Sequence, residues 1–328
     1  MNFVEQEQPT EAIKTLIKNT VLGSNGARYR HVNPLKQLTK LDNPLYFSLM
    51  AKEQCLGNIT LCQRNQSLYL RYFTFHERYQ ASLYSIKRKK SKNSVIKEQV
   101  NRYLNSLIAE TKQSIYAYIE PDNIRSINMA KEFGFNPIAK IAMYHFSRRF
   151  PKASGQFKLL TYDEAIPYIR NQFSTHSYYV ENPQSGLYAA WITNNEMALI
   201  TRLHEGCWEI KSMKGAFGKL LINLIPWVPI LNKIITPNCH KFLAFDSFLV
   251  LNPSIDTKEL NAFLSAGLAH FNGRHMMHWV DESAASSNYL HGVRWGILDK
   301  IIGKSEISLM VKGHAKSGPY FIDAMDML

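Results

Sequence analysis

Three carboxylates occupy positions in the sequence from which they could exchange protons with a bound substrate. Glu77 and Glu120 each end an apolar stretch, SLYLRYFTFHE and SIYAYIE, that is typical of a strand. Asp246 interrupts a third apolar stretch, LAFDSFLVL. A positioned carboxylate can act as a general base, and a buried aspartate can equally bond a backbone or tyrosine group. We take these three residues as the candidate catalytic groups.

A second chemical feature is the basic run KRKKSKNSVIK, residues 87–97, which contains six cations and no acid. The whole chain has 39 Lys and Arg against 26 Asp and Glu, a formal net charge of +13. Such a chain attracts anions, which include nucleic acid, an anionic membrane surface and a phosphorylated small molecule. Nucleic acid fits least well, because the aromatic residues lie in the strands rather than among the cations. A solvated loop is the alternative interpretation of the run.

Metal and disulfide chemistry receive little support from the sequence. His270, His275 and His278 are close in sequence, but a strand places the last two on opposite faces, and no cysteine or carboxylate completes a recognised ligand spacing. We therefore expect no metal. The four cysteines lack a C-x-x-C pair, which argues against a disulfide scaffold and a zinc ribbon and fits a reducing compartment. The acidic N-terminus has no secretory pattern, so a cytoplasmic location is expected.

The elements that would position these groups follow one order in the first half. The patterns predict a helix over residues 11–22 with Thr10 as its cap and Gly23 as its stop, and strands at 45–52, 55–62 and 67–75. A helix near 94–110, a strand at 114–120, a helix at 123–133 and closing strands from 137 follow. The helical crossover requires the strands at 67–75 and 114–120 to be parallel neighbours in one sheet.

The second half repeats this order, which predicts domains over residues 1–149 and 150–328. Strands are predicted at 186–193, 197–203, 207–213, 241–251 and 274–282, with helices at 163–173, 259–271 and 286–295. The ends 305–314 and 319–327 also have strand patterns. An apolar insertion near 214–240 lacks a run of about 20 apolar residues that would span a membrane. We interpret it as a helical insertion over the second sheet, with an amphipathic membrane-surface helix as the alternative.

The stretch YIEPDNIRSINMAKEFGF, residues 118–135, resembles motif B of the GNAT acyltransferases, the Gcn5-related superfamily that uses acyl-coenzyme A. The matching positions are Asn123, Ser126, Phe133, Gly134 and Phe135. The element order resembles the family over about residues 8–149, and the second half resembles a degenerate copy. The resemblance implies an α/β (α+β) fold of two tandem GNAT-like domains. Each would have a mixed, mainly antiparallel sheet with a splayed parallel pair and flanking helices.

The resemblance also implies where coenzyme A would bind. The pantetheine arm would enter between the strands at 67–75 and 114–120, and the pyrophosphate would sit at the N-terminus of the crossover helix. The residues that this implies for cofactor binding are Phe75, Tyr79, Gln80, Ser85, Lys89, Lys90, Asn93, Ser94, Asn123 and Ser126.

Three positions depart from the family pattern. Leu83 and Ser85 replace the glycines of the pyrophosphate loop, and Ala130 replaces the tyrosine that often protonates the leaving thiolate. The expected function is an N-acyltransferase that moves an acetyl or other acyl group from acyl-CoA to an unidentified amine. A non-catalytic, ligand-sensing GNAT-like protein and a basic nucleic-acid-binding module are the alternatives.

Overall fold

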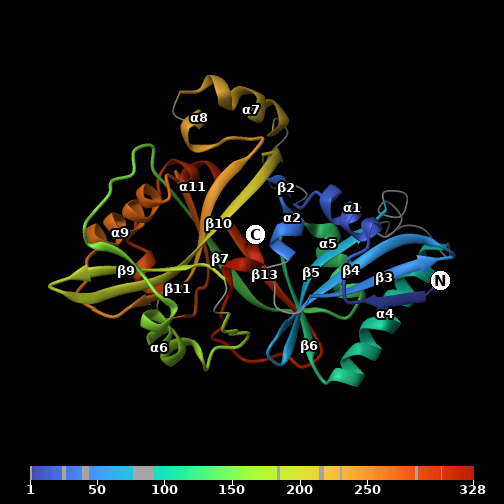
Figure 1. Ribbon diagram of the computed structural model, residues 1–328. Coiled ribbons are helices and arrows are strands. Elements are labelled where there is room, and N and C mark those ends of the chain that lie inside the picture. The colour runs from blue at the N-terminus through green and yellow to red at the C-terminus, as the bar shows by residue number, and fades with distance from the viewer. Residues whose placement is uncertain are drawn as a thin grey trace. The chain divides into compact units, whose positions relative to one another are not determined.

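The computed structural model describes residues 2–23, 27–38, 44–76, 92–182, 185–213, 218–229, 231–284, 287–303 and 305–328. The chain divides into two compact units (Figure 1). Unit 1 consists of Met1–Gly26, Asn33–Ala139 and Ile307–Lys316, and unit 2 of Ala27–Val32, Lys140–Glu306 and Ser317–Leu328. Each unit thus takes a short piece from the other half of the sequence. The single boundary expected between residues 149 and 150 stays a prediction.

The sheet of unit 1 is mainly antiparallel with one parallel pair. Its strands follow the order β1 (Asn2–Gln6), β3 (Pro44–Ala51), β4 (Gln54–Arg64), β5 (Ser67–Phe75), β6 (Ser114–Ile119) and β13 (Ser305–Lys312). β5 and β6 are parallel, as the crossover predicts. The short turn between β4 and β5 holds Asn65 at a positive φ of 52°, a conformation that asparagine tolerates.

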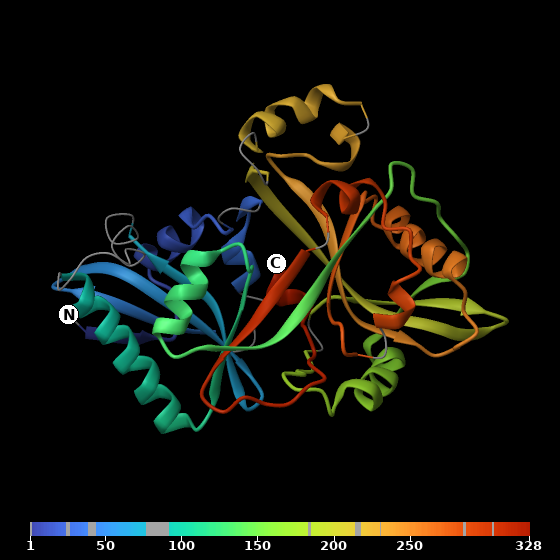
Figure 2. The ribbon, with the colours of Figure 1, turned by 180° about the vertical axis from the view of Figure 1, so that it is seen from behind.

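Helices cover both faces of this sheet. α4 (Lys92–Thr111) and α5 (Ile124–Glu132) pack on one face around an apolar core that includes Phe47, Ile59 and Phe135 (Figure 2). α1 (Glu11–Asn19) packs on β4 and β5, and α2 (Pro34–Leu38) packs on α1. Thr10 caps α1 as predicted, because its hydroxyl accepts from the N–H of Ile13. The helix ends at Asn19, before the predicted stop.

The strands of unit 2 repeat this mixed arrangement. Its strands follow the order β7 (Asn136–Ser147), β12 (His275–Asp281), β11 (His240–Val250), β10 (Glu196–Ser212), β9 (Leu187–Thr193) and β8 (Phe157–Leu160). β11 and β12 are the parallel pair. β2 (Arg28–His31), from the N-terminal part of the chain, pairs with the far end of β10.

Helices of unit 2 surround this sheet. α9 (Thr257–His270) contributes to the main apolar core with Trp191 and Phe245, and α6 (Tyr162–Phe173) packs with Tyr188 and Phe321. The shorter helices are α7 (Gly218–Leu224), η1 (Ile225–Trp227), α8 (Leu231–Ile234), α10 (Ser287–Leu290), α11 (Ile297–Ile302) and η2 (Ala324–Met327). α7 and α8 lie beyond the end of β10 (Figures 1 and 2).

Three sequence predictions for unit 2 are wrong. β10 is one strand rather than two, because Gly206 does not break it. A side chain at Gly206 would collide with Phe242 and Leu328, so this glycine permits close packing inside the strand. The helix expected at 286–295 is limited to α10. The strand expected at 319–327 is an irregular segment that ends in η2.

Two findings concern the cysteines and membrane spans. Cys207 and Cys239 form a disulfide, with their Cα atoms 5.7 Å apart. The argument for a reducing compartment therefore fails for this pair, which the antiparallel β10–β11 pairing brings together. Cys55 and Cys62 are not disulfide-bonded. Among the described residues, no helix combines the length and apolar character needed to cross a membrane.

Candidate functional site

The parallel strands of unit 1 pair only at their beginnings. The recorded β5–β6 partners are Ser67–Ser114, Leu68–Ile115 and Tyr69–Tyr116. Beyond this point β5 continues to Phe75 in register with β4, and β6 continues to Ile119 in register with β13. We name this divergence the β5–β6 fork, made of residues 70–75 and 117–119. It corresponds to the splayed pair that the sequence predicts.

Unit 2 contains a second fork of the same form. β11 and β12 pair at Leu243–Met276, Ala244–Met277 and Phe245–His278. β11 then continues along β10, and β12 continues along β7. Residues 246–250 and 279–281 form this β11–β12 fork. The duplication of architecture expected from the sequence is therefore present in the parallel pairs of both units.

The β11–β12 fork is associated with a segment of the protein itself. The N–H of Ala324 donates to Asp246 Oδ2 at 2.7 Å, and the N–H of Tyr320 donates to Asp281 Oδ2 at 3.0 Å. Asp246 comes from β11 and Asp281 ends β12, so both arms of the fork hold residues 320–324. Ser177 adds two backbone bonds to the same segment, to Pro319 and Phe321.

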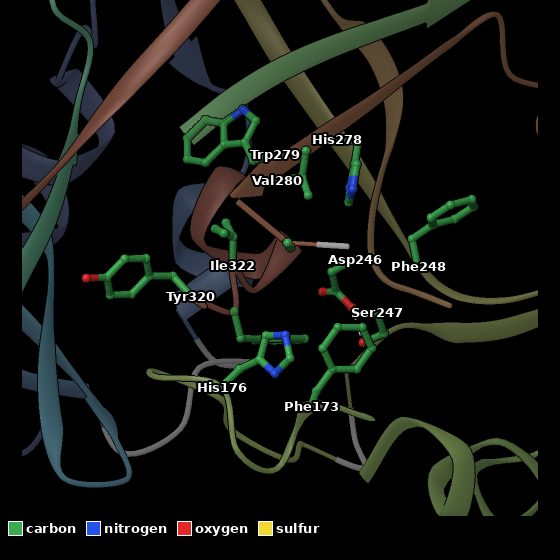
Figure 3. A pocket seen from close by; sticks show the side chains of 12 residues that line it. Phe173, His176, Asp246, Ser247, Phe248, His278, Trp279, Val280, Tyr320 and Ile322 are labelled. Atoms are coloured by element: carbon green, nitrogen blue, oxygen red, sulfur yellow. Dashed lines mark hydrogen bonds between the residues drawn. The ribbon is translucent and has the colours of Figure 1, made fainter. Parts of the chain in front are cut away.

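A small cavity remains in this fork (Figure 3). Its volume is about 30 Å³, and it is lined from β11 by Asp246, from β12 by His278 and from the irregular segment by Tyr320. His176 also contributes to the lining. Drug-sized ligands and cofactors occupy pockets of several hundred Å³, whereas this volume suits water. The cavity therefore has no room for a coenzyme.

Asp246 belongs to a buried ionic network. Arg202 Nε and Nη2 each donate to one Asp246 oxygen at 2.8 Å, and Arg202 Nη2 lies 3.3 Å from Asp323 Oδ1. Burial alone would raise the pKa of Asp246, but the charge of Arg202 holds it well below its ordinary value. His204, Asp246 and Asp323 are close enough to hold a metal ion, yet the guanidinium already supplies a cation there.

The motif that carries the family resemblance has the predicted local structure. Asn123 caps α5, because its carboxamide oxygen accepts from the N–H of Ser126 at 3.2 Å. Gly134 ends the helix with a φ of +81°, a left-handed conformation that favours glycine. Phe133 and Phe135 are buried in the core. Ala130 is also buried there, so a polar proton donor would not fit its surroundings.

The other sequence candidates are placed as follows. Glu120 follows β6 with a half-buried side chain, and its carbonyl accepts from the N–H of Asn123. Phe75 ends β5, and its side chain packs in the apolar core. Only its backbone therefore lies at the edge of the fork. Asn93 and Ser94 lie inside the first turn of α4, which begins one residue before them. Six candidates lie outside the described residues: Glu77, Tyr79, Gln80, Ser85, Lys89 and Lys90.

Sequence reasoning missed a tyrosine group at the base of the β5–β6 fork. The rings of Tyr69 and Tyr116 lie 5.3 Å apart, and Tyr118 lies 5.7 Å from each. Tyr69 and Tyr116 are cross-strand partners, and Tyr118 lies one step further along the same face of β6. Alternate tyrosines in SIYAYIE were the available signal. The group brings three tyrosine rings together where the strands part.

The local histidine trio separates in the structure. His275 bonds His145 Nδ1 at 3.1 Å on one side and His240 Nε2 at 2.8 Å on the other. His278 lies on the opposite face of β12, stacks on Phe245 and bonds the carbonyl of that residue. Burial lowers the pKa of His145, His240 and His278 to about 4, and lowers that of His275 well below its ordinary value.

Comparisons with known proteins identify the class of fold. No protein-family model matches the sequence, and no curated protein sequence matches it. Saccharomyces cerevisiae N-myristoyltransferase with bound myristoyl-CoA superposes with a TM-score of 0.54 at 8% identity, covering 96% of this chain and 84% of that one. A GCN5-related N-acetyltransferase from Sphaerobacter thermophilus gives 0.50 at 12% identity, covering 94% and 95%. A putative acetyltransferase from Pyrococcus horikoshii gives 0.51 at 10%, covering 96% and 90%.

These likenesses and the two forks define a tandem GNAT-like fold. The expected fold class is therefore confirmed. The fold is shared with a GCN5-related N-acetyltransferase and an N-myristoyltransferase.

Proposed function

We propose that the protein is an acyl-CoA-dependent N-acyltransferase and that acyl-CoA binds in the β5–β6 fork. The observation that carries the proposal is the early end of parallel pairing at Tyr69–Tyr116. Past this point the inner edges of both strands offer backbone groups to an extended ligand, as in β-strand addition. The pantetheine arm carries two amides and fits such an edge. The myristoyl-CoA bound by the similar yeast enzyme supports a thioester as the cosubstrate.

Unit 1 is the better candidate for this role than unit 2. Residues 320–324 already bond both arms of the β11–β12 fork, and its cavity of about 30 Å³ suits water rather than a coenzyme. In unit 1 the 20-residue helix α4 follows β5 in the crossover. Its N-terminus favours an anion, and the basic run of residues 87–97 spans its start in the sequence. Unit 2 then serves as a structural partner domain.

Glu120 is our candidate base and Tyr118 our candidate acid. The acceptor amine attacks the thioester carbonyl carbon, and Glu120 accepts the proton that the nitrogen loses. The carbon–sulfur bond then breaks, and the Tyr118 hydroxyl protonates the leaving thiolate. The products are an amide and coenzyme A. Glu77 remains the alternative base. Asp246 suits the role less well, because its bonds to Arg202 keep it ionised and weakly basic.

Ligand binding and turnover test the proposal in sequence. Addition of acetyl-CoA or myristoyl-CoA should raise the Tm, because a ligand that binds only the folded state stabilises it. Hydrogen exchange should slow at residues 70–76 and 117–120 and stay unchanged at residues 246–250. If neither thioester changes the Tm, the proposal is wrong. Protection at residues 246–250 alone would assign the coenzyme to unit 2.

Release of coenzyme A thiol across a panel of amines then separates an enzyme from a sensor. Glu120→Gln should lower kcat by about 10²- to 10⁴-fold while leaving thioester binding intact. Asp122→Asn is the matched control, since Asp122 is an exposed acid two residues away. Binding without turnover of any amine would favour the non-catalytic alternative.

A further inference from the structure

The segment between β10 and β11 combines apolar residues with cations and contains no acid. From Ile210 to Phe245 the sequence has five lysines and neither Asp nor Glu. The described part of this segment includes residues 218–229 and 231–234, which form α7, η1 and α8. We call these residues the α7–α8 segment. Its composition is unusual in a chain in which acids make up 26 of 328 residues.

The α7–α8 segment has two apolar sides, of which only one is buried. Ile225 and Ile234 are 2% and 4% exposed and pack with Leu298 of α11. Ile210 and Met213, at the end of β10, complete this small core. The segment is thus fixed to one end of β10, a strand of the second sheet, and to α11.

The second side forms an exposed apolar patch, made of Leu220, Leu224, Trp227 and Val228. Their exposed fractions are 53%, 47%, 83% and 39%. Leu220 and Leu224 lie one turn apart on α7, and Trp227 and Val228 lie at and directly after the end of η1. A tryptophan this exposed is uncommon, because its large ring is normally mostly buried. Such a patch marks an interaction surface.

The charges of the segment and of the strands that flank it indicate the kind of partner. Lys233 and Lys241 are exposed, and Lys211 pairs with Glu209 at the end of β10. The net charge of +13 adds attraction toward any anionic surface. Tryptophan and leucine beside lysine, without acids, are typical of helices that lie in the headgroup region of a membrane. A partner protein groove would require no such excess of cations.

The two ends of the segment are held together. Cys207 of β10 and Cys239, directly before β11, form a disulfide that encloses α7 and α8. The exposed patch is therefore presented by a closed loop that is anchored through Ile225 and Ile234. Because the loop is closed and anchored, the patch can contact a flat surface with only a small loss of conformational entropy.

We propose that the α7–α8 segment is a docking surface for anionic phospholipid membranes, in which Trp227 and the leucines enter the headgroup region and the lysines contact the anionic headgroups. The proposal is independent of catalysis. It would place the protein at a membrane surface, where an acyltransferase could meet membrane-bound thioesters or acceptors.

Vesicle co-sedimentation of the full chain tests the proposal. The protein should sediment with vesicles in which about one-third of the phosphatidylcholine is replaced by phosphatidylserine, and added salt should weaken this binding. Trp227→Glu should lower the partition coefficient on the order of tenfold, and Lys233→Gln about fivefold. Phe150→Glu is the matched control, because Phe150 is 72% exposed in the same unit but outside the segment.

Three kinds of result would overturn the proposal. The first is a wild-type protein that stays in solution with the anionic vesicles. The second is a Trp227→Glu variant that sediments like the wild type, or a Phe150→Glu variant that loses as much binding. The third is self-association in place of vesicle binding. The molecular mass of the wild-type protein in solution would rise with its concentration, and the Trp227→Glu variant would stay monomeric. A second copy of the chain would then cover the patch.

Discussion

Unit 2 should lose stability in mild acid, because it buries four imidazoles that become charged when the chain unfolds. His145, His240, His275 and His278 are each at most 5% exposed. The pKa of three of them is lowered to about 4, and that of His275 is lowered well below its ordinary value, in each case mainly by burial. An unfolded histidine has a pKa of about 6.5. The unfolded state therefore binds more protons than the folded state below this pH.

The size of the effect follows from proton linkage. All four histidines are neutral in both states above about pH 7, so their contribution to stability is complete there. At about pH 5 each unfolded imidazole is protonated while the folded one stays neutral, which costs about 2 kcal/mol per histidine. Four such groups cost about 8 kcal/mol, which is comparable with the whole stability of a typical domain. The loss begins below about pH 6.5 and continues toward pH 4.

Urea denaturation followed by tryptophan fluorescence measures this effect selectively. All five tryptophans, at positions 191, 208, 227, 279 and 295, belong to unit 2. His278→Gln should reduce the loss of unfolding free energy between about pH 7 and pH 5 by about 2 kcal/mol, whatever it does to stability at neutral pH. His291→Gln, at an exposed histidine of the same unit, is the matched control. Equal stability of the wild type at both pH values would refute the reasoning, as would a His278→Gln variant with the wild-type dependence.

Three further predictions concern charges and hydroxyls. Arg202→Met should destabilise unit 2 by about 3–5 kcal/mol in the same urea assay, because it leaves the buried carboxylates of Asp246 and Asp323 without a cation. The double variant Arg202→Met/Asp246→Asn should recover part of this loss, because one of the two charges is then removed. Lys312→Met should lower the stability of unit 1 by about 1–3 kcal/mol, because the buried carbonyl of Phe133 at the end of α5 loses its hydrogen-bond donor. Hydrogen exchange in α5 measures this loss. The control Lys131→Met, at an exposed lysine, should change stability by less than about 0.5 kcal/mol. Tyr118→Phe should lower kcat by about 10²- to 10⁴-fold with little change in KM, and an unchanged kcat would remove Tyr118 from the mechanism.

Local patterns in the sequence predict the elements that carry the fold. Thr10 and Asn123 cap helices through side-chain bonds to nearby N–H groups, so the signal and its partner lie within three residues. Gly134 ends α5 for a similarly local reason, because its φ is positive. The parallel β5–β6 pair follows from the helical crossover between two apolar strands. Each of these features depends on neighbours in sequence.

Features that depend on distant partners were not predictable in this way. The apolar and aromatic residues at 319–327 favour a strand, yet the segment is held by Asp246 and Asp281 instead. The Cys207–Cys239 disulfide depends on the β10–β11 pairing. Asp246 is prominent in the sequence because it interrupts an apolar strand, but its buried partner Arg202 is not apparent there. Local propensity carries no information on such contacts.

The two forks show how one architecture can serve two roles. Parallel strands that stop pairing after three residues leave backbone groups that must find partners. In unit 2 the carboxylates of Asp246 and Asp281 bind the N–H groups of residues 324 and 320, so the protein closes the fork with its own chain. Asp246 accepts hydrogen bonds from a backbone N–H group and from an arginine, so its role is to hold the chain in place rather than to act as a base. Catalysis by a single unit is therefore the simplest use of the duplication, and the β5–β6 fork is where we expect the coenzyme.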